Sequence, residues 1–379
     1  MTYAGFSVSL IGLIGYVIGI LTMDRIFVRR WTLIAERQEP RRIRLMPVLI
    51  VGIMFSVLFS PLLGGIPSVG AIITAGERLT TISFILGSWY AFNKGNQIAA
   101  LGWVAFAIIF PIVTTLSGGF IGFGVITFLM IAVFSTSFLK SNWLLLGLAV
   151  LVSYLGLSVW VTYSRDRQEI REVVWGNRDF EKRLVRVYST FKEFEPFNPF
   201  EIDHLESLDI RFNKNHEVGR SVEYLSHPYN SYAKGETVGF ALISWIPRIV
   251  WPNKPMIGGS ADLVSRSTGM RVADGTSMGV GQILEFYFNF GKLGVVVGMC
   301  FLGCVIRYLD IHAAVCLKEE NVVGFILWYL PLLVMIQPAG ALSEVISSCV
   351  AAGLLSFGLN WYFKHFELRN LQERYIKSG

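Results

Sequence analysis

Long apolar runs that contain almost no charge constrain this chain more than any other feature. A helix crosses the hydrocarbon core of a bilayer with ~20 mostly apolar residues, and its backbone must satisfy its own hydrogen bonds there. Only 16% of the residues are charged, whereas an ordinary soluble domain has about a quarter. The candidate spans are residues 5–23, 46–66, 80–94, 98–116, 120–138, 142–163, 289–309, 322–340 and 342–363. The third is short, and we expect its helix to begin earlier, near Ile72. The runs predict an all-α polytopic membrane protein with about nine transmembrane helices, within a range of roughly 8–11.

Basic residues between the runs predict how the chain crosses the membrane. Cytoplasmic loops are enriched in lysine and arginine, and the loop 24–45 contains Arg25, Arg29, Arg30, Arg37, Arg41, Arg42 and Arg44. Counting spans from this loop places the turns near Lys94 and Lys140 inside and the long polar stretch outside. The expected organisation is therefore N-terminal helices in 1–163, an extracytoplasmic insert in 164–288, C-terminal helices in 289–363 and a cytoplasmic tail in 364–379. The net charge of +6 then reflects topology, and no nucleic-acid partner is expected.

The outer insert is predicted to be helical. Apolar residues at three- and four-residue spacing in 166–193 indicate an amphipathic helix along the membrane surface, broken near Gly176. Residues 201–226 are predicted to form a second helix. Residues 237–251 are apolar but too short to span a bilayer, and Pro247 interrupts them. We therefore expect a re-entrant or interfacial element whose backbone is buried by protein.

The segment 244–259 carries two cations between aromatic residues on a proline-stiffened backbone. The side chains of Arg248 and Lys254 suit phosphate oxygens, and Trp245 and Trp251 offer indole faces that can pack on sugar rings. The pattern indicates a site for a ligand with an anionic head and sugars, such as a lipid-linked saccharide. Snorkelling of Arg248 to lipid phosphates is an alternative, as is simple solvent exposure of Lys254.

Four further arginines of the insert are candidate substrate ligands, namely Arg211, Arg220, Arg266 and Arg271. The first two lie on roughly one side of the predicted helix 201–226. Salt bridges with Glu217 and Glu223 on the helix surface explain them equally well. For the other two, a solvated loop is the alternative interpretation.

Three stretches of the chain resemble one family. Asp209-Ile-Arg-Phe-Asn-Lys-Asn215, Ile246-Pro-Arg-Ile-Val-Trp-Pro-Asn-Lys-Pro255 and Gly281-Gln-Ile-Leu-Glu-Phe-Tyr-Phe-Asn-Phe-Gly291 are similar to segments of the Wzy-type oligosaccharide repeat-unit polymerases, which make O-antigen and exopolysaccharide in bacterial envelopes. An arginine followed eleven positions later by a glycine recurs in outer loops of some members, and Arg248 and Gly259 match it. The similarity covers mainly residues 205–310. It implies a GT-C-like architecture of the kind that membrane-embedded polymerases and ligases share, in the bacterial cytoplasmic (inner) membrane.

The resemblance also implies an activity, the polymerisation of polyprenyl-diphosphate-linked oligosaccharide repeat units at the outer face of the membrane. In such polymerases a hydroxyl of one lipid-linked unit attacks the anomeric carbon of the growing glycan, and lipid diphosphate leaves. The protein must neutralise the diphosphate, align two sugars and remove a proton. Besides the lipid-linked oligosaccharides and membrane lipid, flippase and chain-length regulator proteins are the expected partners.

Arg248, Glu285 and His216 are the candidate catalytic residues. We expect Glu285 at the outer membrane face, where desolvation can tune a carboxylate as a base, and His216 has an intrinsic pKa suited to proton transfer. Pairing of Glu285 with a helix dipole is an equally ordinary role, and a lone loop histidine is usually incidental. Because no paired-aspartate motif occurs in an outer loop, we expect a metal-independent glycosyltransferase without a cofactor. The four cysteines show no zinc-ligand spacing.

Three other functions are consistent with parts of the pattern. An O-antigen ligase shares the donor and differs in the acceptor. A transporter or flippase of lipid-linked oligosaccharide is expected to bury charges midway along several spans or to show two similar halves. The charges here concentrate in the outer insert, which favours catalysis at the membrane surface. A scaffold subunit of an envelope assembly stays open, since an aromatic and basic loop also suits a protein partner.

Overall fold

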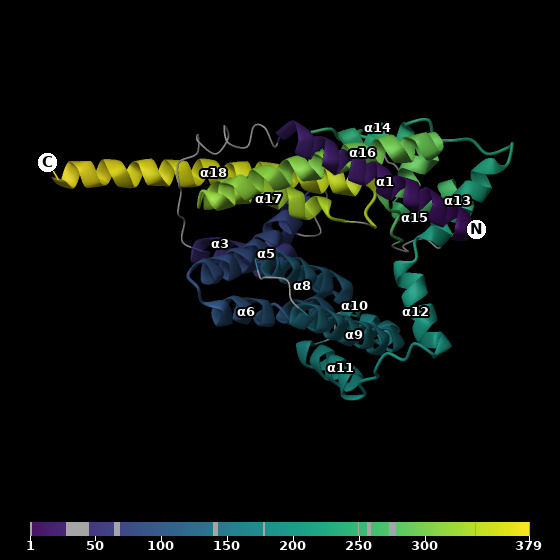
Figure 1. Cartoon of the computed structure of the whole chain (residues 1–379), viewed down its shortest axis with the longest axis horizontal. Coiled ribbons are helices and arrows are strands. Elements are labelled where there is room, and N and C mark those ends of the chain that lie inside the picture. The colour runs from purple at the N-terminus through teal and green to yellow at the C-terminus, as the bar shows by residue number, and fades with distance from the viewer. Residues whose placement is uncertain are drawn as a thin grey trace. The chain divides into compact units, whose positions relative to one another are not determined.

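The computed structural model describes residues 2–27, 45–63, 69–138, 143–176, 179–248, 250–255, 259–272, 278–337 and 339–378. Every secondary-structure element in these ranges is a helix (Figure 1). The prediction of an all-α protein is therefore confirmed. Packing divides the chain into two compact units, which are residues 1–80 together with 214–379, and residues 81–213.

The first unit combines helices from both ends of the chain. It contains α1 (Thr2–Phe27), α3 (Leu45–Met54), a π-helical turn (Phe55–Phe59), α4 (Ser60–Leu63) and the start of α5 (Gly70–Asn93), followed by α13 (Asn215–Ser226), α14 (Glu236–Ile243), α15 (Ser260–Thr268), α16 (Gln282–Lys318), α17 (Val322–Met335) and α18 (Leu342–Ser378). The helix α16 packs along α1 and α17, and α17 packs along α18 (Figure 1). Polar α13 packs against both α1 and α15.

Small residues let α1 approach α16 closely. Gly12, Gly15 and Gly19 lie on the buried face of α1. A Cβ atom at Gly15 would lie 2.7 Å from Val296 O, and one at Gly19 would overlap with Cys300 O. Larger side chains would therefore force the two backbones apart, which is why small residues recur where membrane helices pack.

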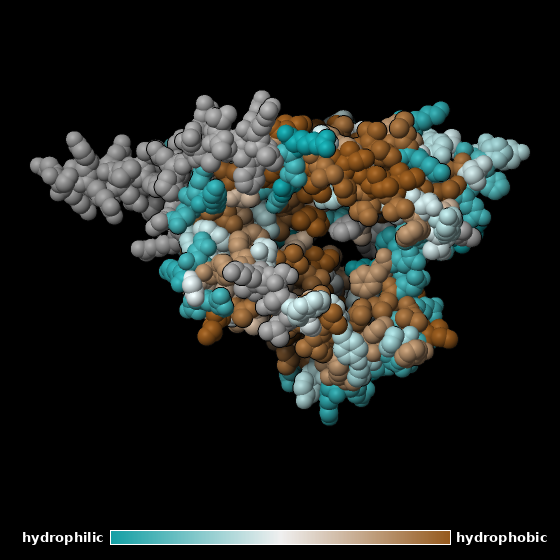
Figure 2. Space-filling view, viewed as in Figure 1, coloured by the Kyte–Doolittle hydropathy of each residue, from teal (hydrophilic) through white to brown (hydrophobic). Residues whose placement is uncertain are grey.

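Five described helices are long and apolar enough to cross a membrane, namely Thr2–Phe27, Gln97–Ser117, Leu146–Arg165, Gln282–Lys318 and Leu342–Phe363. Shorter apolar helices cover Leu45–Phe59, Ile121–Thr136 and Val322–Met335. Large apolar side chains are exposed on α1 and α16, and they form a broad apolar face in Figure 2. The chain therefore has the helices of a multi-pass membrane protein, and the number of about nine spans stays a prediction.

The second unit contains the remainder of α5, then α6 (Gln97–Phe106), α7 (Ile109–Gly118), α8 (Ile121–Thr136), α9 (Trp143–Arg165), α10 (Arg167–Trp175), α11 (Phe180–Lys192) and α12 (Ile202–Phe212). A small core of Ile121, Tyr163, Ile170 and Val174 joins α8, α9 and α10. The Tyr163 hydroxyl is buried in this core and donates to Gly119 O at 2.6 Å. The apolar side chains Ile170 and Val174 therefore attach α10, a short and otherwise polar helix, to the end of α9.

The helices of the insert are confirmed in part. The amphipathic segment 166–193 forms α10 and α11, and the first of these ends at Trp175, as the glycine at 176 predicts. The helix that begins near Ile72 in the prediction is α5, which begins at Gly70. The described residues of 237–251 belong to α14, which has 8 residues and is too short to cross a bilayer, and to the loop that follows it.

The prediction of one helix over residues 201–226 is wrong. The helix α12 ends at Phe212, and α13 begins at Asn215. Asn213 has non-helical backbone angles (φ −89°, ψ 85°), and its side-chain amide donates to the Asp209 carboxylate at 2.8 Å. The backbone angles of Asn213 end α12 at this point, and the chain leaves the second unit here and enters the first.

Some topological predictions lie outside the described residues. They concern the arginines between positions 29 and 44 and Lys140, whereas Arg25 lies in the last turn of α1. The two packing units do not coincide with the topological division, since the second unit ends at Asn213, inside the predicted insert 164–288. Packing units are defined by contacts within the protein and do not show on which side of the membrane a segment lies. The division into 1–163, 164–288, 289–363 and 364–379 therefore stays a prediction.

Candidate functional site

The membrane-length helix α16 breaks near its start. Gly291 has φ 64° and ψ −153°, a combination that is essentially restricted to glycine because a side chain would collide with the neighbouring backbone. The residues before and after Gly291 therefore form two helical segments joined at a kink. Such a break in an apolar helix requires protein groups that satisfy the freed backbone carbonyls.

A segment just before α14 provides those groups. Ala233 N donates to Phe288 O at 2.9 Å, and Lys234 N donates to Asn289 O at 3.2 Å. In an unbroken helix both carbonyls would accept from residues one turn later. The break is therefore built by two segments that are distant in sequence and is held by specific backbone hydrogen bonds.

The Asn289 side chain reinforces this junction. It is 1% exposed, accepts a hydrogen bond from Gly235 N at 3.1 Å and donates to Thr237 Oγ1 at 2.6 Å. Next to it, Lys234 has a φ of 50°, which is uncommon for a residue with a side chain. Backbone held in sparsely populated conformations clusters at functional sites, so the junction is a candidate site.

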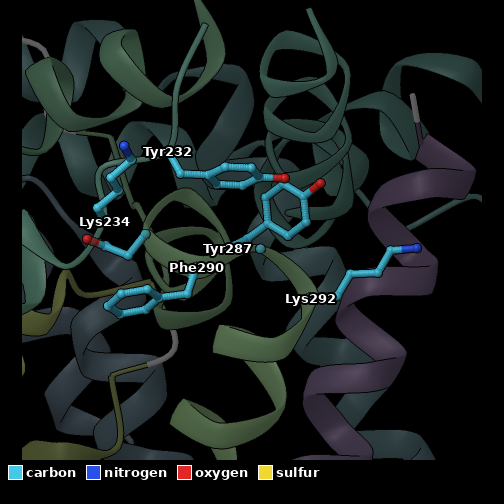
Figure 3. A pocket seen from close by; sticks show the side chains of 7 residues that line it. Tyr232, Lys234, Tyr287, Phe290 and Lys292 are labelled. Atoms are coloured by element: carbon cyan, nitrogen blue, oxygen red, sulfur yellow. The ribbon is translucent and has the colours of Figure 1, made fainter. Parts of the chain in front are cut away.

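A cavity of about 570 Å³ opens at the junction, within the usual size of ligand pockets, roughly 300–1,000 Å³. It is lined by Tyr232, Lys234, Tyr287, Asn289, Phe290, Gly291 and Lys292. Figure 3 shows the hydroxyls of Tyr232 and Tyr287 near each other, and the centroids of the two rings are 6.1 Å apart. In the same view Lys234 and Phe290 lie on one side of the tyrosine pair, and Lys292 extends on the other.

The lining of the cavity is cationic and aromatic. Lys234 and Lys292 are exposed, and no acidic side chain occurs among the described residues that form the lining. Ammonium groups attract phosphate oxygens, whereas tyrosine combines an apolar ring with a hydroxyl that can bond to sugar hydroxyls. The cavity can therefore hold a ligand with an anionic group and sugar rings.

Glu285 is buried one turn before the junction and caps another helix. It is 2% exposed, and its Oε2 accepts the N–H of Leu342, the first residue of α18, at 2.7 Å. A carboxylate at this position satisfies a free backbone donor and interacts favourably with the helix dipole. The geometry thus gives Glu285 a structural role, and its role as a general base stays a prediction.

The proline-rich loop after α14 brings Arg248 and Lys254 together. Lys254 Nζ donates to Ser244 O and, at 3.0 Å, to Ile246 O, while Arg248 Nη1 donates to Lys254 O at 3.2 Å. Burial and then the charge of Arg248 hold the pKa of the Lys254 ammonium below its usual range. Both cations therefore help to close the loop, and their binding of diphosphate stays a prediction.

The other predicted ligands near this loop have separate surroundings. Trp251 is 36% exposed. Arg266 on α15 donates to the Glu236 carboxylate at 2.8 Å, and this hydrogen bond raises the pKa of the guanidinium. Arg271 and Gly259 are exposed at the two ends of the described segment that contains α15. A Cβ atom at Gly259 would meet no atom within 4 Å, so packing does not require a glycine there.

Arg211 and Arg220 lie in different packing units. Arg211 belongs to α12, whereas Arg220 and His216 belong to α13. The expectation that one helix presents both arginines is wrong because the backbone breaks at Asn213. Within the described structure, the buried Nε of Arg220 has no hydrogen-bond partner, and His216 is exposed.

One group of side chains has metal-ligand composition. Oxygen and nitrogen atoms of Glu195, Glu201 and His204 lie within 4.8 Å of one another. Asn198 N donates to His204 Nδ1 at 3.0 Å, so Nε2 carries the proton and donates to Glu195 Oε1 at 2.9 Å. A neutral imidazole with both nitrogens engaged has no lone pair for a metal. The group is therefore a hydrogen-bonded link between the loop after α11 and the first turn of α12.

The cavity residues did not emerge as a site from the sequence. Two local signals were present, because Asn289-Phe-Gly291 interrupts an apolar run and Lys234-Gly235 is a turn dipeptide. Neither signal reveals that the two segments meet, since Gly235 and Asn289 lie 54 positions apart. Their contact depends on tertiary packing.

Comparison with known proteins identifies the family to which the chain belongs. A search of curated proteins and a search of solved structures found no match. A family model described as "Domain of unknown function (DUF8712)" matches residues 4–356. The match extends from α1 into α18 and includes the cavity, the loop after α14 and the helices of both packing units. The chain therefore belongs to the DUF8712 family.

Proposed function

We propose that this protein is a membrane glycosyltransferase that polymerises polyprenyl-diphosphate-linked oligosaccharide repeat units at the outer face of a bacterial cytoplasmic membrane. The cavity at the Gly291 break carries the proposal. Its two lysines suit a diphosphate, and its three aromatic rings suit sugars. The apolar faces of α1 and α16 offer a surface for the polyprenyl chain.

The reaction needs few groups from the protein. A hydroxyl of the acceptor saccharide attacks the anomeric carbon of the donor, the bond from that carbon to the diphosphate oxygen breaks, and the electron pair leaves with the lipid diphosphate. The hydroxyl proton passes to a base or to water. In this proposal Lys234 and Lys292 neutralise the departing diphosphate, while Tyr232, Tyr287 and Phe290 orient the two sugars.

The loop after α14 supplies further cations in this scheme. Arg248 and Lys254 are held together by the loop's own carbonyl groups, so a diphosphate would meet guanidinium and ammonium groups whose positions are set in advance. Among the predicted bases, His216 is exposed and therefore accessible to an acceptor hydroxyl. Glu285 is engaged with the start of α18 and is the weaker candidate.

Deletion of the gene, followed by gel electrophoresis of surface glycans, tests the proposal against its alternatives. A polymerase deletion leaves glycans of a single repeat unit. Long chains that fail to reach their acceptor would identify a ligase instead. Lipid-linked units that accumulate on the cytoplasmic side would identify a flippase. A glycan ladder identical to that of the parent strain would contradict all three.

Complementation then tests the cavity itself. We expect a chain with both Lys234→Ala and Lys292→Ala to reach the membrane at normal levels without restoring long glycans. The control is Lys192→Ala, which removes an exposed lysine from α11 and should restore the full ladder. Normal glycan length with the double variant would contradict the role of the cavity.

A further inference from the structure

Three arginines of the second unit form a cluster of like charges. Arg167 and Arg171 lie one turn apart on α10, and Arg211 lies on α12. The guanidinium of Arg171 is repelled by the positive charges of both other arginines, and the guanidinium of Arg211 is repelled by that of Arg167. Burial and then the charge of Arg167 hold the pKa of the Arg171 guanidinium below its usual range. Such an arrangement is unfavourable unless a counter-charge is present.

Two carboxylates that lie close to the cluster along the chain are engaged elsewhere. Asp166 and Glu169 both bind Arg186, at 3.0 Å and 2.6 Å. In the described part of the second unit, no carboxylate forms an ion pair with any arginine of the cluster. The Nε atoms of Arg167 and Arg171 are also buried without a hydrogen-bond partner in the described structure. Buried polar groups normally have partners. The described chain supplies no anion to the cluster, so an anion from outside the chain is the expected partner.

Aromatic rings hold two of the three guanidinium groups in place. The Arg171 guanidinium lies 4.3 Å from the centroid of the Phe120 ring and 5.3 Å from that of Trp175. The Arg211 guanidinium lies 5.5 Å from the centroid of the Trp160 ring. Stacking of this kind fixes the plane of a guanidinium and leaves the N–H donors at its edge for a ligand.

The cluster lies at the end of a membrane-length helix. The apolar stretch Leu146–Arg165 ends two residues before Arg167, and Trp160 lies in its last turns. Tryptophan at a helix end is typical of the membrane–water boundary, where the lipid phosphates lie. The amphipathic helices α10 and α11 continue from this point, as expected for segments that follow the membrane surface.

We infer that Arg167, Arg171 and Arg211 form a binding site for a phosphate-bearing anion at the membrane surface, with the headgroup phosphate of an anionic phospholipid as its ligand. The fork of a guanidinium donates to two phosphate oxygens at once, and three such groups around one anion remove the repulsion within the cluster. The cluster and the cavity at Gly291 belong to different packing units, and the test of the cluster below does not depend on the proposed reaction.

Lipid titration of the purified full-length protein in neutral detergent tests this inference. The probes are dioleoylphosphatidylglycerol, dioleoylphosphatidylcholine and inorganic pyrophosphate, and the readout is the apparent Kd from the rise in melting temperature. The variant is Arg211→Gln, which removes the exposed member of the cluster. The control is Lys192→Gln, which removes the same charge from the same unit outside the cluster.

We expect phosphatidylglycerol to bind the unmodified protein more tightly than phosphatidylcholine, and Arg211→Gln to weaken that binding about tenfold while the control does not. Tighter binding of pyrophosphate than of phosphatidylglycerol, with the same loss in Arg211→Gln, would support the phosphate site and identify a soluble anion as its ligand. Equal losses in both variants, or no loss in Arg211→Gln, would overturn the inference. Should Arg211→Gln melt abnormally without lipid, Arg211→Lys keeps the charge without the fork and should retain part of the affinity.

Discussion

Substitution of Gly291 by alanine tests how the candidate site is built. With φ 64° and ψ −153°, this position lies in a region that a residue with a side chain occupies only at a cost of about 1–3 kcal/mol. The added Cβ would lie 3.5 Å from the Tyr232 hydroxyl, an ordinary contact, so the cost is conformational and not steric. Alanine also favours a continuous helix, which would draw Phe288 and Asn289 into normal helical hydrogen bonding.

The structure sets the size of the expected effect. A straightened helix removes the acceptors of Ala233 N and Lys234 N, and each such hydrogen bond contributes about 1 kcal/mol. Loss of that contribution corresponds to a fall in amide protection of roughly fivefold, because 1.4 kcal/mol is a factor of ten. We therefore expect both amides to exchange roughly fivefold faster in Gly291→Ala, together with a lower melting temperature.

Hydrogen exchange measured by mass spectrometry on the full-length protein in detergent provides the assay, read on peptides that cover residues 230–238. Gly353→Ala in α18 is the matched control, since its added Cβ would meet no atom within 4 Å and its backbone is helical. Unchanged exchange at Ala233 and Lys234, with a melting temperature equal to that of the control, would refute the account of the break.

Three further predictions follow from other contacts. Gly19→Val should destabilise the pairing of α1 with α16 by about 1–3 kcal/mol, seen as faster proteolysis in detergent, and wild-type resistance would contradict the close packing. Arg248→Ala should abolish chain elongation with normal membrane insertion, and Arg248→Lys should rescue poorly because the bidentate geometry is lost; wild-type glycan length in Arg248→Ala would refute this. Acidification should loosen the second unit, because Asp166 hydrogen-bonded to Arg165 and Glu195 hydrogen-bonded to His204 both have a pKa below the usual range. The stabilisation by these two carboxylates is complete above about pH 4–5 and is lost as the pH falls through their lowered pKa values. Hydrogen exchange in residues 160–205 should therefore rise at acidic pH. Exchange that does not depend on pH, after correction for the intrinsic rate, would contradict this prediction.

Much of the helical pattern was predictable because local forces determine it. The apolar runs predict membrane-length helices, since a run such as Leu146–Arg165 must bond its own backbone in lipid. The glycine at 176 likewise marks the end of α10. The break at Asn213 was missed because no glycine or proline marks it in the sequence, and glycine and proline are the strongest local signals that a helix ends.

The candidate site was less predictable than the helices. A loop such as the one with Arg248 and Lys254 can be recognised from its own residues, because the prolines and cations are contiguous. The cavity requires Tyr232 and Tyr287 to meet, which no local pattern specifies.

The arginine cluster was missed for a related reason. On α10, Arg167 and Arg171 occupy the polar face of an amphipathic helix, and from sequence alone such residues are expected to be solvated. Packing of α12 against α9 adds Arg211 and places Trp160 beside it. Only the assembled unit therefore shows a cluster without a counter-charge.

Chain elongation by the purified protein in liposomes is the most direct test of the proposed function. The substrate is the lipid-linked repeat unit extracted from the deletion strain, and the products are separated on a gel. We predict a ladder of glycans with the unmodified protein and with Lys192→Ala, and single repeat units when Lys234→Ala and Lys292→Ala are combined. The absence of any ladder with correctly folded unmodified protein, or an undiminished ladder with the double variant, would contradict the account.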